Sequence, residues 1–168
     1  ENALTMFVDA YRVTKNLMER DPKNTDRIFG HAQSEYWVGY LAYLQNDRAT
    51  ASTKFEMYKH FSDQLLAFDD AEPQWLREAS YADGNLCSFN LQDEGNLKTA
   101  VGQCRNALKR MERLLKLMPN DTKTIQDVAN RHAWMADALN KTGDKIGQLK
   151  HRLKQETIVR KLLKSDPE

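Results

Sequence analysis

The segment "RLLKLMPND", residues 113–121, decides the fold because closely similar segments recur along the chain. It joins the apolar end of a helix to a proline, which has no backbone N–H and therefore ends one helix or opens the next. The related segments are "NLMERDPKN" at 16–24, "QLLAFDDAEP" at 64–73 and "KLLKSDPE" at 161–168. Together they hold all four prolines: Pro22, Pro73, Pro119 and Pro167. The first prediction is therefore a repeated helical unit.

Three columns of residues give the length of this unit. Apolar pairs begin at four positions that are 48, 49 and 48 residues apart: Leu17, Leu65, Leu114 and Leu162. Midway between them, a large apolar residue precedes a small one, and the small residues are Gly39, Cys87 and Ala136. Eight residues after each small residue comes a turn position: Asp47, Gly95 and Asp144. The chain divides accordingly into units at 1–22 (partial), 23–72, 73–119 and 120–168.

Each unit has the apolar spacing of two helices. Between residues 97 and 118, apolar residues recur three or four positions apart and basic residues occupy the opposite side, as in an amphipathic helix. The same reasoning predicts seven helices, at 3–18, 25–45, 49–68, 74–93, 97–118, 122–142 and 145–163. No segment alternates apolar and polar residues with a period of two, so we predict no sheet. The predicted fold class is all-α.

The residues beside the predicted helices have the side chains that helix ends require. Asn24 and Asp121 precede helices and supply oxygens for an N-cap. Gly95 and Gly143 stand in the turns inside the units, where we expect a positive φ after a helix. At Gly39 and Ala136 the small side chain is expected to let the second helix approach the first closely, so that a leucine there would overpack the interface.

The composition fits a folded helical protein. Charged residues make up 29% of the chain and the mean hydropathy is −0.74, yet the apolar residues are periodic, which argues against disorder. No apolar run approaches the ~20 residues of a membrane span. Cys87 and Cys104 lie on apolar helical faces, and we expect buried free thiols, a reducing compartment and a cytoplasmic location. Because the chain begins at Glu1 without Met, we expect a piece of a longer protein.

These residues resemble the tetratricopeptide repeat family. Its signature is a large–small pair, a Gly-Asp turn eight residues later, an alanine four residues further on and a closing proline. In one unit Gly39, Asp47, Ala51 and Pro73 fill these places, and the segment "TIQDVANRHAWMADALNKTGD" at 124–144 looks most like the long variant in bacterial multidomain signalling proteins. The chain departs from the family in its period of 48 instead of 34, in Cys87 and Ala136 where the family has glycine, and in Gln148 where it has alanine.

The resemblance implies a right-handed solenoid of antiparallel helical hairpins, about three and a half repeats long. It also implies a partner-binding groove lined by the first helix of each unit, with the small residues Gly39, Cys87 and Ala136 packing the repeats. The groove positions carried over from the family are Gln33, Tyr36, Tyr40 and Tyr43, then Tyr81, Gly84, Ser88 and Leu91, then Asn130, Ala133, Asp137 and Asn140.

The tyrosines at 36, 40 and 43 form one helical stripe, and tyrosine combines a large contact area with a polar tip. Two interpretations stay open: the stripe binds a peptide, or it packs against the next unit. Trp37, Val38 and Leu41 offer a packing face of their own, which leaves the stripe available to a partner. The leading functional hypothesis is thus a scaffold for protein–protein interaction inside a signalling or regulatory protein, with no cofactor.

Charge and the first helix raise further alternatives. Residues 1–96 carry 9 Lys/Arg and 16 Asp/Glu, whereas residues 97–168 carry 16 and 8. The basic part could attract nucleic acid or an acidic ligand, but acidic residues are interleaved with the basic ones and aromatic residues are scarce there, so a solvated face is favoured. The helix at 3–18 has no preceding helix to pack against. Two explanations stay open: chain that precedes it in a longer protein covers its apolar side, or a second copy does so in a homodimer. The apolar residues concerned are Leu4, Phe7, Val8, Tyr11 and Leu17.

No motif for catalysis or metal binding is present in the sequence. There is no H-E-x-x-H, no phosphate-binding glycine-rich loop and no G-x-S-x-G. His31 and Glu35 stand four residues apart, but one such pair on a helix surface is no metal site. His60, His132 and His151 are expected to be satisfied or solvated. An enzyme with its active site in the groove is the third hypothesis, and we predict that the chain is not an enzyme.

Overall fold

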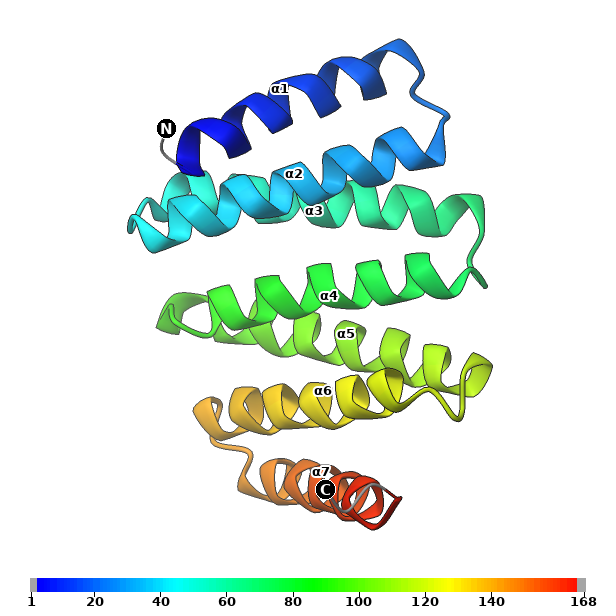
Figure 1. The fold of residues 1–168 in the computed structure, drawn as a ribbon. Coiled ribbons are helices and arrows are strands. Elements are labelled where there is room, and N and C mark those ends of the chain that lie inside the picture. Colours follow the sequence, from blue (N-terminus) through cyan, green and yellow to red (C-terminus); the bar gives the residue numbers. More distant parts are fainter. Residues whose placement is uncertain (1–2, 166–168) are drawn as a thin grey trace. The chain divides into compact units, whose positions relative to one another are not determined.

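The computed structural model describes residues 3–165 and is all-α over that range (Figure 1). Its elements are α1 (Ala3–Arg20), α2 (Thr25–Leu44), α3 (Arg48–Phe68), α4 (Pro73–Asn90), η1 (Glu94–Asn96), α5 (Leu97–Leu117), α6 (Thr122–Lys141) and α7 (Lys145–Ser165). The prediction of an all-α fold is confirmed, and each predicted helix is present within three residues at either end. The short 3₁₀ helix η1 was not predicted.

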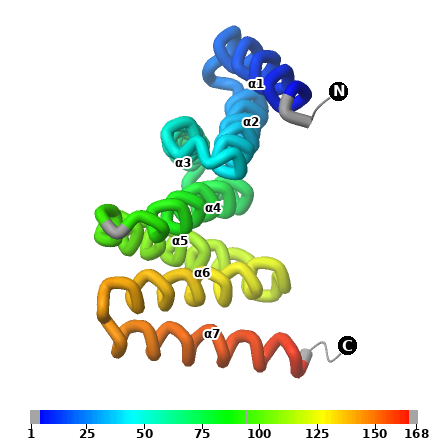
Figure 2. Tube along the Cα trace, turned by 90° about the vertical axis from the view of Figure 1, so that its left-hand side faces the viewer, coloured from blue at the N-terminus to red at the C-terminus, as the bar shows by residue number. Residues whose placement is uncertain are grey.

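The chain divides into two compact units, Glu1–Ala71 and Glu72–Glu168, and each is described by itself. In the first unit, α2 packs against both α1 and α3. In the second, α5 packs against both α4 and α6, and α6 packs in turn against α7 (Figure 2). The last helix of the second unit therefore has its main neighbour on one side.

The predicted helix starts are confirmed by their hydrogen bonds. The side chain of Asn24 accepts from the backbone N–H of Arg27 at 3.1 Å, and that of Asp121 accepts from Thr124 at 2.9 Å. Pro73 occupies the first turn of α4, as its missing N–H favours. Pro167 lies outside the described residues.

The turns inside the units only partly follow the prediction. Gly143 has a φ of +84°, as expected at the end of α6. The prediction of a positive φ for Gly95 is wrong, because Gly95 lies in η1, where its N–H donates to the Asp93 side chain at 3.0 Å. In the first unit the left-handed residue is Asn46, with a φ of +62°, directly before the N-cap Asp47. Asparagine tolerates this conformation better than most residues do.

Gly39 marks a close approach between α2 and α3. A Cβ atom at Gly39 would lie 2.9 Å from Cβ of Lys54 and 3.1 Å from the ring of Phe55, both on α3. The other two residues of the small-residue column, Cys87 and Ala136, are fully buried. The absence of a side chain at Gly39 therefore allows α2 and α3 to approach closely, as the sequence predicts.

Cys87 and Cys104 correct another expectation. The structure joins them in a disulfide between α4 and α5, with Cα atoms 5.1 Å apart. The prediction of free thiols is therefore wrong, and the argument for a reducing compartment that rested on it falls as well. The physical reason is register: the two cysteines face each other across the α4–α5 contact, close enough for their side chains to meet. Around them lies an apolar cluster that includes Leu91, Leu108 and Met135.

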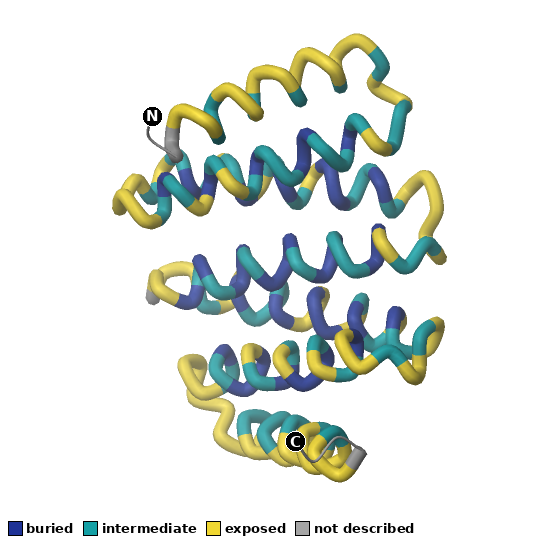
Figure 3. Tube along the Cα trace, in the orientation of Figure 1, coloured by how far each residue is buried: buried dark blue, intermediate teal, exposed yellow. Residues whose placement is uncertain are grey.

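Burial is uneven along the chain (Figure 3). The middle of α4 is almost wholly buried, whereas α1 and α7 consist of exposed and half-buried residues. Both α1 and α7 carry large apolar side chains on their exposed surface, among them Met6, Val13, Ile146 and Leu163.

Candidate functional site

The aromatic residues of α2 form the most extensive ring cluster in the first unit. Tyr36 stacks on Tyr40, with ring centroids 6.1 Å apart, and contacts the ring of Trp37 at 5.0 Å. On its other side, Tyr36 packs against Tyr58 of α3 at 5.5 Å. Burial, together with the neighbouring Tyr40, raises the pKa of Tyr36. Tyr36 is therefore a half-buried residue that anchors the more exposed rings.

The exposed side of this cluster is a stripe along α2. Trp37, Tyr40 and Leu44 are 41%, 37% and 61% exposed and follow one another at spacings of three and four. Phe7 of α1 stacks on Trp37 with ring centroids 5.6 Å apart. We call Trp37, Tyr40 and Leu44 the α2 aromatic face. The rings behind it hold its side chains in place, which lowers the conformational entropy lost when a partner binds.

The first-unit groove residues named by the sequence are only partly on this face. Tyr40 belongs to it, whereas Tyr36, Gln33 and Tyr43 are half-buried. Trp37 and Leu44 were missed. Trp37 was predicted to pack within the array. An apolar residue in a helix does not by itself show which side of that helix other elements will cover, so its exposure could not be predicted.

A buried polar network lies beside the ring cluster and ties the three helices of the first unit together. Glu35 contacts Nε2 of His31 at 3.2 Å and Nζ of Lys54 at 2.9 Å, and both His31 and Glu35 are only 2% exposed. Nδ1 of His31 lies 3.3 Å from the Thr14 hydroxyl, and Lys54 lies over the ring of Tyr11 at 4.0 Å. The expectation that His31 and Glu35 lie on a helix surface is therefore wrong, because α1 and α3 cover them.

The charges of this network stabilise one another. Burial alone would raise the pKa of Glu35, but hydrogen bonds and charges from His31 and Lys54 outweigh it, so the pKa lies below its ordinary value. Burial alone would lower the pKa of Lys54, but contacts with Tyr11 and Glu35 raise it overall. The network is thus a charged, mutually compensated part of the core.

In the second unit, the predicted groove residues of α4 are held by α6. The Tyr81 hydroxyl donates to Asp127 at 2.7 Å, and burial, together with Asp127, raises the pKa of Tyr81 to about 12. The guanidinium of Arg131 lies over the Tyr81 ring at 5.3 Å and against Gly84, where a Cβ would collide with it. Arg77 adds hydrogen bonds to Asp121 and Thr124 at 3.1 and 2.9 Å.

The remaining groove positions differ widely in exposure. Leu91 is 5% exposed within the apolar cluster and is not accessible to a partner. Ser88 and Ala133 are half-buried, and Asn130 is exposed. The carboxylate of Asp137 accepts from Arg152, and the amide oxygen of Asn140 accepts from Lys145. These positions do not form a second apolar face comparable to that of α2.

Two histidines that are far apart in the sequence meet in the second unit. Nδ1 of His132 on α6 lies 2.9 Å from Nδ1 of His151 on α7, and Glu112 lies 3.9 Å from Nε2 of His132. Burial, His151 and Lys154 lower the pKa of His132 to about 4. Burial and nearby lysines, Lys154 above all, also lower the pKa of His151. This contact is one that sequence spacing cannot reveal, since it depends on the α6–α7 register.

Within residues 3–165, no group of three or more potential ligand side chains is arranged to hold a metal ion. The same part of the chain contains no helix of the length and hydropathy needed to cross a membrane.

The chain was also compared with known proteins. No family model matches the sequence, and no curated protein matches it significantly. The likeness to tetratricopeptide repeats therefore depends on the residues quoted above.

Proposed function

We propose that this chain is a protein-interaction module whose α2 aromatic face binds a segment of a partner protein. The observation that carries the proposal is the exposure of Trp37, Tyr40 and Leu44 on one side of a helix whose rings are braced from behind by Tyr36 and Phe7. Aromatic side chains dominate the binding energy of many protein interfaces. A contiguous exposed apolar patch often marks a protein-interaction site.

We further propose that the chain is a solenoid of helical hairpins of the tetratricopeptide type. One contact recurs one period apart in support of this. Gly39 faces Phe55 across α2 and α3, and Cys87 faces Cys104 across α4 and α5. The first pair is 16 residues apart and the second 17, and the corresponding members are 48 and 49 apart. In such an array the interaction surface needs no catalytic residue and no cofactor.

The test begins with a random peptide library displayed on phage and selected on the whole chain. Peptides that bind are synthesised, and their dissociation constants are measured for the chain and for the variants Trp37→Ala and Tyr40→Ala. Trp134→Ala is the matched control, because Trp134 on α6 is 39% exposed, much like Trp37.

The proposal expects peptides whose affinity falls at least about tenfold with either variant in α2, as is usual for a residue central to an interface, and is unchanged with Trp134→Ala. Peptides that bind equally well to both α2 variants would refute the α2 aromatic face as the binding surface.

A further inference from the structure

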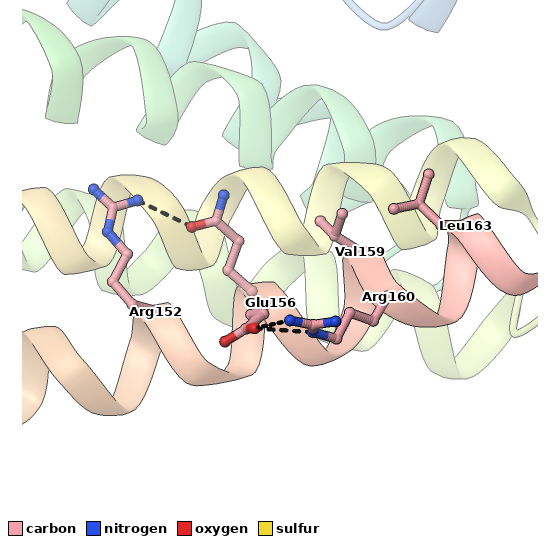
Figure 4. Close-up of a pocket in the computed structure, with 6 residues that line it drawn as sticks. Arg152, Glu156, Val159, Arg160 and Leu163 are labelled. Carbon is pink, nitrogen blue, oxygen red and sulfur yellow. Dashed lines mark hydrogen bonds and ion pairs between the residues drawn. The ribbon is translucent and has the colours of Figure 1, made fainter.

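An open hollow with a volume of about 600 Å³ lies along one side of α7 in the second unit. Its lining comes from one helix and consists of Arg152, Gln155, Glu156, Val159, Arg160 and Leu163, which we call the α7 face. Figure 4 shows Val159 and Leu163 projecting side by side from α7, while Glu156 and Arg160 pair along the helix. Val159 and Leu163 are 39% and 62% exposed, so two large apolar side chains of this face meet solvent.

The repeat explains why this face is open. A shift of 48 residues carries α5 onto α7, so Cys104, Leu108 and Met111 correspond to Arg152, Glu156 and Val159. In α5 those three residues are buried, and α5 packs against a helix on each side, α4 and α6. In α7 the corresponding positions remain accessible, and the main neighbour is α6 alone. The α7 face is therefore open at positions that are covered in α5.

The charge of α7 restricts what can occupy this position. Residues Lys145–Ser165 contain seven Lys or Arg and one Glu, giving a net charge of +6. A second α7 would repel it. None of the helices α1–α6 carries a strong negative charge: α2 and α4 each have two acidic and one basic residue, and α1, α3, α5 and α6 each have more basic than acidic residues.

We propose that the α7 face is a docking surface for an acidic amphipathic helix of a partner protein. The apolar side chains of that helix would contact Val159 and Leu163, and its carboxylates would be attracted by the net positive charge of α7, in which Arg152 already pairs with Asp137 and Arg160 with Glu156. Three further exposed apolar residues, Ile146, Leu149 and Leu153, recur at spacings of three and four near the start of α7, about a quarter turn around the helix from Val159 and Leu163. Helices that pack along such ridges contact each other at this spacing.

A helix fits this surface better than a bilayer or a nucleic acid. The α7 face contains the Glu156–Arg160 ion pair, with its atoms 2.7 Å apart. This pair would lose its hydration if the face entered the interior of a bilayer, which costs free energy. The α7 face has no aromatic side chain on which a base could stack. Acidic vesicles and duplex DNA are nevertheless included in the test, because both are attracted to a cationic helix. The proposal does not depend on the α2 aromatic face, which lies in the other unit.

The experiment measures binding of fluorescent peptides to the whole chain by anisotropy. The probe is a designed helix of about 20 residues, roughly 30 Å long, with leucine at alternating spacings of three and four and glutamate elsewhere. A peptide of the same composition in scrambled order keeps the charge and loses the apolar seam. Vesicles of phosphatidylserine and phosphatidylcholine, and a DNA duplex, are titrated in parallel.

The variants are Leu163→Asp and Arg160→Glu, both at exposed positions, so circular dichroism should show an unchanged fold. The matched control is Lys116→Glu, an exposed residue beside a different hollow on α5 that is also lined by basic side chains. We expect the designed peptide to bind at least tenfold more tightly than the scrambled one. Each α7 variant should weaken binding about tenfold or more, and Lys116→Glu should leave it unchanged.

Equal binding of the designed and scrambled peptides would overturn the proposal, since only charge would then be recognised. It would also be overturned if the α7 variants left peptide binding intact, or if they abolished binding of vesicles or DNA while the designed peptide failed to bind.

Discussion

Glu35 shows at the scale of one residue how the first unit depends on a buried charge. Its carboxylate is 2% exposed and touches both His31 and Lys54. Removing one partner of a buried ion pair leaves an uncompensated charge. We predict that Lys54→Met, which keeps most of the apolar stem, lowers the free energy of unfolding by about 3 kcal/mol in urea titrations.

The control for this prediction is Lys15→Met. Lys15 pairs with Glu19 at 3.9 Å, and both side chains are about half exposed or more, so the change should cost less than about 0.5 kcal/mol. Equal effects of the two variants would contradict a special role for the buried pair.

The same carboxylate gives a pH dependence with a defined sign. Because the folded-state pKa of Glu35 is lowered, its contribution to stability is complete above the unfolded-state pKa of about 4.3. The contribution is lost as the pH falls through the lower folded-state pKa. The difference in unfolding free energy between the chain and Lys54→Met should therefore shrink in strongly acidic solution. A difference that stays constant down to the lowest pH at which the chain is folded would refute this assignment.

His132 also loses stability toward acid, at higher pH than Glu35, because its folded-state pKa of about 4 lies below the ordinary value of 6.5. Between these two values the unfolded chain binds more protons than the folded one, so stability falls as the pH decreases. The loss approaches about 3 kcal/mol below pH 4. We predict that His132→Asn reduces the slope of unfolding free energy between pH 7 and 4.5. Superimposable slopes would show that His132 does not titrate in this way.

At the scale of the elements, the addition of one methyl group at Gly39 tests how closely α2 and α3 pack. A Cβ at Gly39 would fall within 2.9 Å of the backbone-proximal Cβ of Lys54, which cannot move far. We predict that Gly39→Ala destabilises the chain by about 1–3 kcal/mol through overpacking, as measured by denaturant unfolding.

Gly102 is the matched control, since it lies inside α5 with nothing within 4 Å of its Cβ position. Gly102→Ala should stabilise the chain by about 0.5–1 kcal/mol, the difference in helix propensity. Destabilisation by Gly102→Ala, or tolerance of Gly39→Ala, would contradict the packing described for these helices.

The helices themselves could be predicted from the sequence because their signals are local. Apolar spacing, N-caps such as Asn24 and the proline at 73 act within a few residues. What could not be predicted depends on which residues face each other across helices. The Cys87–Cys104 disulfide, the His132–His151 contact and the exposure of Trp37 all follow from packing register, and period alone does not determine it. Leu91 was predicted to line the groove but is buried, and this too depends on packing register.

At the scale of the whole molecule, α1 raises the question of oligomeric state. Met6, Val13 and Leu17 are exposed along one side of α1, and the helix is nearly neutral, so two copies would not repel each other as two α7 helices would. We predict a concentration-dependent dimer in light scattering that Val13→Glu abolishes and Arg12→Glu leaves intact. A strict monomer at high concentration would exclude this association.

The most direct test of the proposed function uses the three tryptophans as reporters. Trp37 belongs to the α2 aromatic face, Trp75 is largely buried, and Trp134 is exposed on α6. Each contributes one indole N–H signal to a nitrogen–proton correlation spectrum of this 19.5 kDa chain. On titration with a selected peptide, the signal of Trp37 should shift or broaden and that of Trp134 should stay in place. A spectrum in which Trp134 responds and Trp37 does not would contradict binding at the α2 aromatic face.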